Sequence, residues 1–80
     1  MKSIRIQYFA NLREERGLSE EVVQTSAVTF AELYDSLQEE HGLYLKRRKL
    51  KVAVNDNFVD WEEEPREGDL VVFIPPVGGG

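Results

Sequence analysis

Hydrophobic and polar residues alternate along several short stretches of the chain. Ile4, Ile6 and Tyr8, for example, are separated by Arg5 and Gln7. A period of two residues places the apolar side chains on one face of an extended chain. This alternation and the β-favouring residues predict five strands, at residues 3–9, 20–25, 49–54, 58–59 and 70–74.

The strand expected at 70–74 is a continuous run of five apolar residues. Such a run is typical of a strand at the centre of a sheet, covered on both faces for at least part of the time. The strand at 3–9 is also strongly apolar, and parallel pairing of the two at the sheet centre would bury both. The turn-forming residues 55–57 (Asn-Asp-Asn) predict that 58–59 pairs back on 49–54.

Two helices are expected between the strands. Residues 10–17 are good helix formers that end at a glycine, and they predict a short helix. Thr29 and Glu32 have the spacing of a capping box, and Gly42 supplies a C-terminal stop. The residues between them that share one helical face are Phe30, Leu33, Tyr34, Leu37 and His41.

The order of these elements predicts an α+β domain over residues 1–74, followed by a flexible tail at 75–80. One long helix would cover one face of a mixed sheet. This is a β-grasp (ubiquitin-like) arrangement, which by itself says little about function.

Composition excludes several kinds of site. The 80 residues fit one domain, and with 41% hydrophobic and 31% charged residues the chain is expected to be globular. Without cysteine it has no disulfide, thiolate metal site or cysteine nucleophile. One histidine, His41, cannot form a histidine-based metal site, and no metal or cofactor is expected to bind.

The net charge of −5 favours neither nucleic acid nor an anionic membrane as a partner. No apolar run is long enough to span a bilayer, so a cytoplasmic protein is expected. The charges are unevenly distributed along the chain. Residues 46–51 contain five of the ten basic side chains, so the rest of the chain has five basic and fifteen acidic side chains. This cluster could contact an acidic partner or a phosphate, although a solvated loop leading into a strand is the favoured interpretation.

The chain ends in Pro75-Pro76-Val77-Gly78-Gly79-Gly80, and here a chemical role can be predicted. Many chain ends are simply frayed. Here, however, the prolines end the strand and stiffen its exit, and the glycines form a strip without side chains that leads to an α-carboxylate. A carboxylate is a poor electrophile, so it must first be activated, most plausibly as an acyl-adenylate that another protein makes from ATP. A sulfur donor can then convert it to a thiocarboxylate.

Some large apolar residues are out of phase with the predicted core. Three of them would lie on the sheet face that lacks the helix. The candidate partner interface comprises Phe9, Phe58, Ile74, Pro75 and Pro76. Partial burial under the short helix or the polar loop at 62–69 is an equally good alternative, and Trp61 could belong to either side.

Several segments together resemble the small subunit of molybdopterin synthase, a family of ubiquitin-like sulfur carriers. The matching segments are Tyr8-Phe9-Ala10, Leu12-Arg13-Glu14, Val52-Ala53-Val54-Asn55, Glu67-Gly68-Asp69 with Val71, and Phe73-Ile74-Pro75-Pro76-Val77-Gly78-Gly79-Gly80. The resemblance covers essentially the whole chain. Gly78 departs from it, because a larger or polar residue is familiar there.

The resemblance implies that an E1-like adenylyltransferase adenylates Gly80 with ATP and that a sulfur donor protein then supplies the sulfur. The tail, Gly78, Gly79 and Gly80, would insert into the large subunit of the synthase and pass sulfur to cyclic pyranopterin monophosphate. Two small and two large subunits form the usual assembly. The catalytic residues would belong to the partner, so this chain would be a sulfur-donating subunit without an active site of its own.

Three alternatives remain open from the sequence. The chain could be a sulfur carrier of another pathway, such as thiamine synthesis. It could be a ubiquitin-like modifier that is joined to lysines through Gly80. It could also be a β-grasp binding module that uses residues 46–51, for example on RNA, although the acidic remainder of the chain counts against this.

Overall fold

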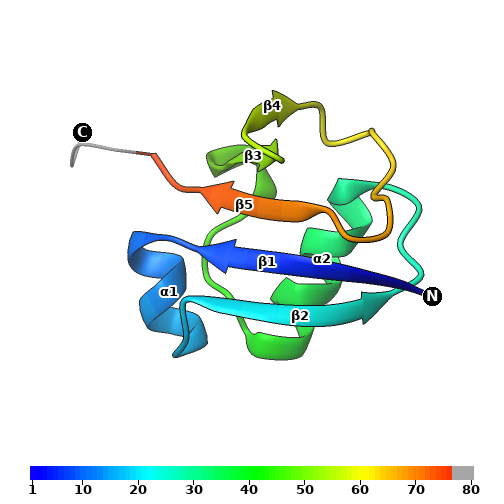
Figure 1. Ribbon diagram of the computed structural model, residues 1–80. Coiled ribbons are helices and arrows are strands. Elements are labelled where there is room, and N and C mark those ends of the chain that lie inside the picture. Colours follow the sequence, from blue (N-terminus) through cyan, green and yellow to red (C-terminus); the bar gives the residue numbers. More distant parts are fainter. Residues whose placement is uncertain (77–80) are drawn as a thin grey trace.

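The computed structural model describes residues 1–76, which fold into one five-stranded sheet with helices (Figure 1). The elements in chain order are β1 (Lys2–Tyr8), α1 (Ala10–Arg16), β2 (Glu20–Thr25), α2 (Phe30–His41), the 3₁₀ turn η1 (Arg47–Lys49), β3 (Lys51–Val54), β4 (Asn57–Val59) and β5 (Leu70–Ile74). The predicted α+β class and β-grasp arrangement are confirmed.

The sheet has the strand order β2-β1-β5-β3-β4, with β5 in the middle. β1 and β5 run parallel, and their register pairs Arg5 with Leu70 and Tyr8 with Phe73. The other three pairings, β1 with β2, β3 with β4 and β3 with β5, are antiparallel. The predicted parallel pairing of the first and last strands at the sheet centre is therefore confirmed.

Helix α2 lies across one face of the sheet, behind it in Figure 1. At its start the Thr29 hydroxyl accepts a hydrogen bond from the backbone N–H of Glu32, and the Glu32 carboxylate accepts one from the N–H of Val28. Gly42 ends the helix in the left-handed conformation, with φ of +66°. The apolar face of α2 packs into the core together with inward-facing residues of β1, β3 and β5.

The second face of the sheet is less buried than the face that packs on α2. Val71 and Phe73 of β5 are fully buried, but Leu70, Val72 and Ile74 between them are only half-buried. No helix of residues 1–76 lies over this second face, so the expectation that β5 is covered on both faces for at least part of the time stays a prediction. Helix α1 instead sits at the end of β1 (Figure 1).

Four strand boundaries also shift, and two of these shifts are by a single residue at the starts of β1 and β4. Phe9 is not the last residue of β1 but the residue that precedes α1, and its backbone is still extended. The strand expected to begin at residue 49 begins at Lys51, because the chain before it forms the η1 turn. In that turn the N–H groups of Lys49 and Leu50 donate to the carbonyls of Lys46 and Arg47, at 2.9 and 3.0 Å.

Candidate functional site

The end of β5 fixes where the predicted tail leaves the folded body. β5 ends at Ile74, as predicted, and is followed by Pro75, which is buried, and Pro76, which is exposed. Burial of Pro75 keeps the chain on the body for one residue beyond the strand. Gly78, Gly79 and Gly80, the residues predicted to carry the chemistry, lie outside the described residues.

An aromatic cluster packs beneath the end of β5. The ring of Phe73 stacks on Trp61, with centroids 6.0 Å apart, and meets Tyr34 edge-on at 5.0 Å. Trp61 is partly buried against the core, so it lies on the helix-covered side of the sheet. Of the two positions that the sequence allowed for Trp61, the structure shows the one against the core.

The opposite, open face carries the predicted interface residues. Phe58 is 69% exposed and Phe9 is 48% exposed, so neither is covered by α1 or by the polar loop. Phe9 follows the buried Tyr8 in an extended conformation, which turns its side chain to the open face beside the end of β5. Ile74 is half-buried on the same face. The role of these residues in binding a partner stays a prediction.

The open face has further apolar members that the sequence analysis did not single out. Ala53 of β3 pairs with Phe58 on one side and with Val72 on the other, so an apolar row crosses three strands. The signal for this row was present in the uninterrupted apolar sequence of β5. We call Ala53, Phe58, Val72 and Ile74 the apolar row.

A partly buried carboxylate links α1 to the sheet near Phe9. Glu21 accepts a hydrogen bond from the Tyr8 hydroxyl at 2.6 Å and two from the Arg16 guanidinium at 2.8 and 2.9 Å. Burial opposes ionisation of Glu21, but the hydrogen bonds from Arg16 and Tyr8 together lower the pKa of its carboxyl. Burial and the neighbouring carboxylate raise the pKa of Tyr8 well above its usual range. The arrangement holds α1, and therefore Phe9, in a fixed place on the sheet.

A second group of polar contacts, which we call the clasp, consists of the hydrogen bonds of Asn55 and Asp69 and supports the β3–β4 hairpin that carries Phe58. The Asn55 amide donates to the Asp69 carboxylate and accepts from the N–H of Leu70, both at 3.1 Å. The second carboxylate oxygen of Asp69 accepts from the N–H of Arg66 at 2.8 Å. The turn between β3 and β4 is thereby joined to the start of β5.

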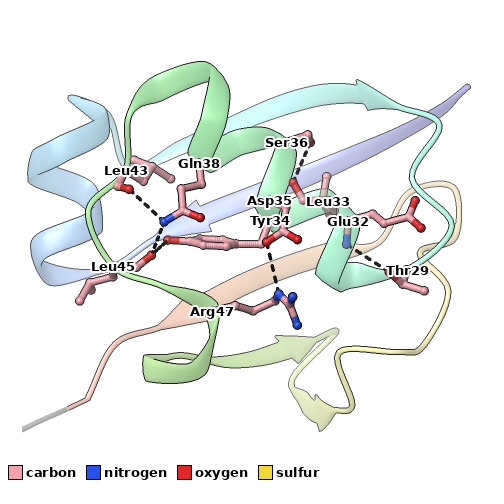
Figure 2. A network of polar contacts seen from close by, with 10 residues as sticks. All are labelled: Thr29, Glu32, Leu33, Tyr34, Asp35, Ser36, Gln38, Leu43, Leu45 and Arg47. Carbon is pink, nitrogen blue, oxygen red and sulfur yellow. Dashed lines mark hydrogen bonds and ion pairs between the residues drawn. The ribbon is translucent and has the colours of Figure 1, made fainter.

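The basic cluster at 46–51 is held on α2 by a polar network (Figure 2). The Tyr34 hydroxyl donates to the carbonyl of Leu45, and the Gln38 amide donates to the carbonyls of Leu43 and Leu45 at 3.1 Å. Arg47 pairs with Asp35 at 3.3 Å. The largely exposed side chains agree with the favoured expectation of a solvated loop leading into a strand, and the hydrogen bonds hold the backbone of this segment in place.

Comparison with protein families matches residues 6–80 to the ThiS family. The chain belongs to this family. Two curated relatives are named molybdopterin synthase sulfur carrier subunit. The protein of Escherichia coli is 32% identical over 96% of this chain and 99% of its own length, and that of Drosophila melanogaster is 30% identical over 98% and 91%.

Solved structures of similar proteins share the fold of this ThiS family chain. Subunit 1 of a molybdopterin converting factor from Pyrococcus furiosus has a TM-score of 0.80 at 26% identity, covering 96% of this chain and all of its own. SAMP1 from Haloferax volcanii has a TM-score of 0.78 at 25% identity, covering 98% and 99%. Subunit 1 in a complex with subunit 2 of the molybdopterin-converting factor from Helicobacter pylori has a TM-score of 0.68 at 25% identity, covering 98% and 99%.

Within residues 1–76, this ThiS family protein has no group of three His, Asp or Glu side chains that could hold a metal ion. No helix in that range is long and apolar enough to cross a membrane. The described residues include three features that bear on function. These are the apolar row on the open face, the two prolines that follow β5, and the basic segment that is hydrogen-bonded to α2 beside them.

Proposed function

We propose that this chain is the sulfur carrier subunit of a molybdopterin synthase. Its Gly80 would carry sulfur as a thiocarboxylate and donate it to cyclic pyranopterin monophosphate. The observation that carries the proposal is the Pro-Pro-Val-Gly-Gly-Gly sequence directly after the central strand, in a chain whose full-length relatives are named sulfur carrier subunits.

The α-carboxylate of Gly80 would react in two steps. Its oxygen attacks the α-phosphate of ATP on an E1-like adenylyltransferase, and pyrophosphate leaves. Hydrosulfide supplied by a donor protein then attacks the carbonyl carbon. The bond between this carbon and the AMP oxygen breaks, AMP leaves, and loss of the sulfur-bound proton gives the thiocarboxylate. Glycine suits this chemistry because a backbone without Cβ can enter a channel too narrow for other residues.

The proposed receiving partner is the large subunit, in an assembly of two small and two large subunits. The apolar row and Phe9 support this, because they lie on the open face of the sheet from which the tail begins, where Phe58 and Phe9 are exposed and Val72 and Ile74 are half-buried. Exposed aromatic and aliphatic groups of this kind commonly anchor protein interfaces. The similar Helicobacter pylori protein is found in a complex with subunit 2. Residues 75–80 would then act as the tail that enters the partner.

A second candidate is a ubiquitin-like modifier joined to lysines through Gly80. The similarity to SAMP1, whose relatives in the comparison are named small archaeal modifier proteins, favours it. Both functions share the acyl-adenylate, so they differ only in the nucleophile that follows. Sulfur carriage in another pathway, such as thiamine synthesis, differs instead in the acceptor.

The test is incubation with the activating enzyme, ATP and a sulfide source, followed by intact-mass spectrometry. We expect a mass increase equal to the replacement of one oxygen by sulfur. The chain lacking Gly80 is the control, which should fold normally and show no such increase. Adding the large subunit and cyclic pyranopterin monophosphate should restore the original mass and yield sulfurated pterin. An unchanged mass with the cognate activating enzyme would contradict the proposal, and lysine adducts without pterin sulfuration would favour the modifier.

A further inference from the structure

The basic cluster flanks the root of the tail. A surface hollow at the end of β5 is lined by Arg48, Lys49, Leu50 and Lys51 together with Ile74, Pro75 and Pro76. Lys51 pairs directly with Ile74 in the β3–β5 register. We call Lys46, Arg48, Lys49 and Lys51 the basic rim. Any protein that takes up the tail must come close to it.

The charges of the basic rim are not neutralised within the described residues. All four side chains belong to exposed residues, and none of them forms an ion pair with a carboxylate of residues 1–76. Arg47, the fifth basic residue of the cluster, differs because it pairs with Asp35 and lies 5.9 Å over the ring of Trp61. The rim is thus a positive region on a chain that is otherwise strongly acidic.

The rim is also held in a defined position. The side chains of Tyr34 and Gln38 donate hydrogen bonds to the carbonyl of Leu45, just before the rim (Figure 2). The η1 turn orders the backbone within the rim, and the side chain of Leu50 is buried in the core. Because the backbone of this segment is already ordered, a partner that binds the rim has to order only the side chains.

We propose that the basic rim docks against a carboxylate-rich surface of the activating enzyme, beside the channel that takes the tail. The inference rests on the proposed function, in which Gly80 is activated on another protein. A carrier must meet and leave this enzyme in every cycle. Complementary exposed charges suit such a partner, because they speed and orient encounter more than they strengthen the complex. A polyanion such as RNA fits less well, because the acidic remainder of the chain would repel it.

The experiment measures association with the activating enzyme by stopped flow, at low and high salt, for the full chain and its variants. Arg48→Glu and Lys49→Glu each reverse one rim charge. Arg66→Glu is the matched control: it makes the same charge change at another exposed arginine, in the loop before β5 and thus at the opposite end of that strand. Trp61 fluorescence checks that each variant is folded.

We expect each rim variant to associate about tenfold more slowly at low salt, with the difference largely lost at high salt. Arg66→Glu should associate nearly as fast as the original chain. Equal slowing in Arg66→Glu, or no slowing in the rim variants, would overturn the proposal. Slowing with the large subunit but not with the activating enzyme would also overturn it, as would rim-dependent binding of a short RNA in place of the enzyme.

The rate of adenylation at saturating carrier separates this inference from the proposed function. Rim variants should reach the original maximal rate, because the tail itself is unchanged. If the unaltered chain is not adenylated at all, the proposed function fails. If it is adenylated but the rim variants associate normally, only the docking inference fails.

Discussion

Trp61 lies parallel to Phe73, with ring centroids 6.0 Å apart and an angle of 8° between the planes. Tyr34 meets both rings edge-on, so three aromatic side chains close the core beneath the end of β5. Pro75, the first residue after β5, comes two residues after Phe73 in the chain. Aromatic packing therefore anchors the part of the sheet from which the tail starts.

Removing the Phe73 ring should strongly destabilise the protein. Phe73 is fully buried, so Phe73→Ala should lower the free energy of unfolding by about 3–5 kcal/mol. Phe58→Ala is the matched control, since Phe58 is also in a strand but mostly exposed, and it should change stability by less than about 0.5 kcal/mol. Urea unfolding followed by Trp61 fluorescence measures both, and similar losses in the two variants would contradict the assignment of faces.

Glu21 should make stability depend on pH in the acid range. Its pKa is lowered in the folded protein, so its contribution is present above the unfolded-state value of about 4.3 and is lost as pH falls through the folded-state value. At pH 7, Glu21→Gln should cost about 1–3 kcal/mol. The gap between the two proteins should narrow as the pH falls below about 4. A gap that stays constant in urea unfolding from pH 7 to pH 3 would exclude an ionised Glu21 as the cause; Glu20→Gln, at an exposed pair, should show a smaller loss.

Asn55 should resist substitution for two separable reasons. It has a positive φ of +50°, and its side-chain amide donates to Asp69 and accepts from the N–H of Leu70 at the start of β5. Asn55→Gly keeps the backbone conformation accessible and loses only the side-chain bonds, at a cost of about 1 kcal/mol. Asn55→Ala should cost about 1 kcal/mol more, because alanine is strained there. Thermal unfolding ranks the two variants, and equal stabilities would argue against backbone strain.

The apolar row should matter for binding and not for folding. If it contacts the large subunit, Phe58→Ser should weaken the complex tenfold or more, roughly the effect of losing a hot-spot side chain. Val22→Ser is the control, because Val22 is 61% exposed on the same face but lies on the outer strand β2. Calorimetric titration against the large subunit gives both affinities. Equal weakening by the two variants would point to general surface hydrophobicity instead of this row.

Removing the Tyr34 hydroxyl should weaken the attachment of the basic segment to α2. Tyr34→Phe removes the hydroxyl that donates to Leu45 and should cost about 1 kcal/mol. Hydrogen exchange of the Lys49 and Leu50 amides should become faster. Tyr44→Phe should leave both unchanged, because Tyr44 is 76% exposed and its hydroxyl makes no hydrogen bond within residues 1–76. If exchange is the same in both variants, the hydroxyl does not fasten the segment. Burial raises the pKa of Tyr34 to about 12, so this bond should persist well into alkaline solution.

Most of the fold could be predicted from local periodicity. Ile4, Ile6 and Tyr8 defined the inner face of β1, and Thr29 with Gly42 marked both ends of α2, because these signals depend only on neighbouring residues. The environment of Trp61 could not be predicted, since a side chain between two strands has no periodicity of its own.

Contacts between side chains that are far apart in the chain could not be predicted from the sequence either. Glu21 resembles any exposed strand glutamate until Tyr8 and Arg16 are brought to it by the β1–β2 pairing and the position of α1. The η1 turn escaped prediction because its lysines and arginines suit a loop and a turn equally well. How far the second face of β5 is covered could not be predicted, because a continuous apolar run does not distinguish burial in the core from burial at an interface.

The parallel neighbours β1 and β5 come from opposite ends of the described chain, with Arg5 beside Leu70. During synthesis on the ribosome, β1 therefore lacks its central partner until almost all of the domain has emerged. A chain interrupted before residue 70 would expose both the edge of β1 and the apolar side of α2, which makes such fragments prone to aggregation and proteolysis. The domain should consequently fold late and all at once, so that a chain with an intact sheet is also one that has been translated through to the segment leading into the tail.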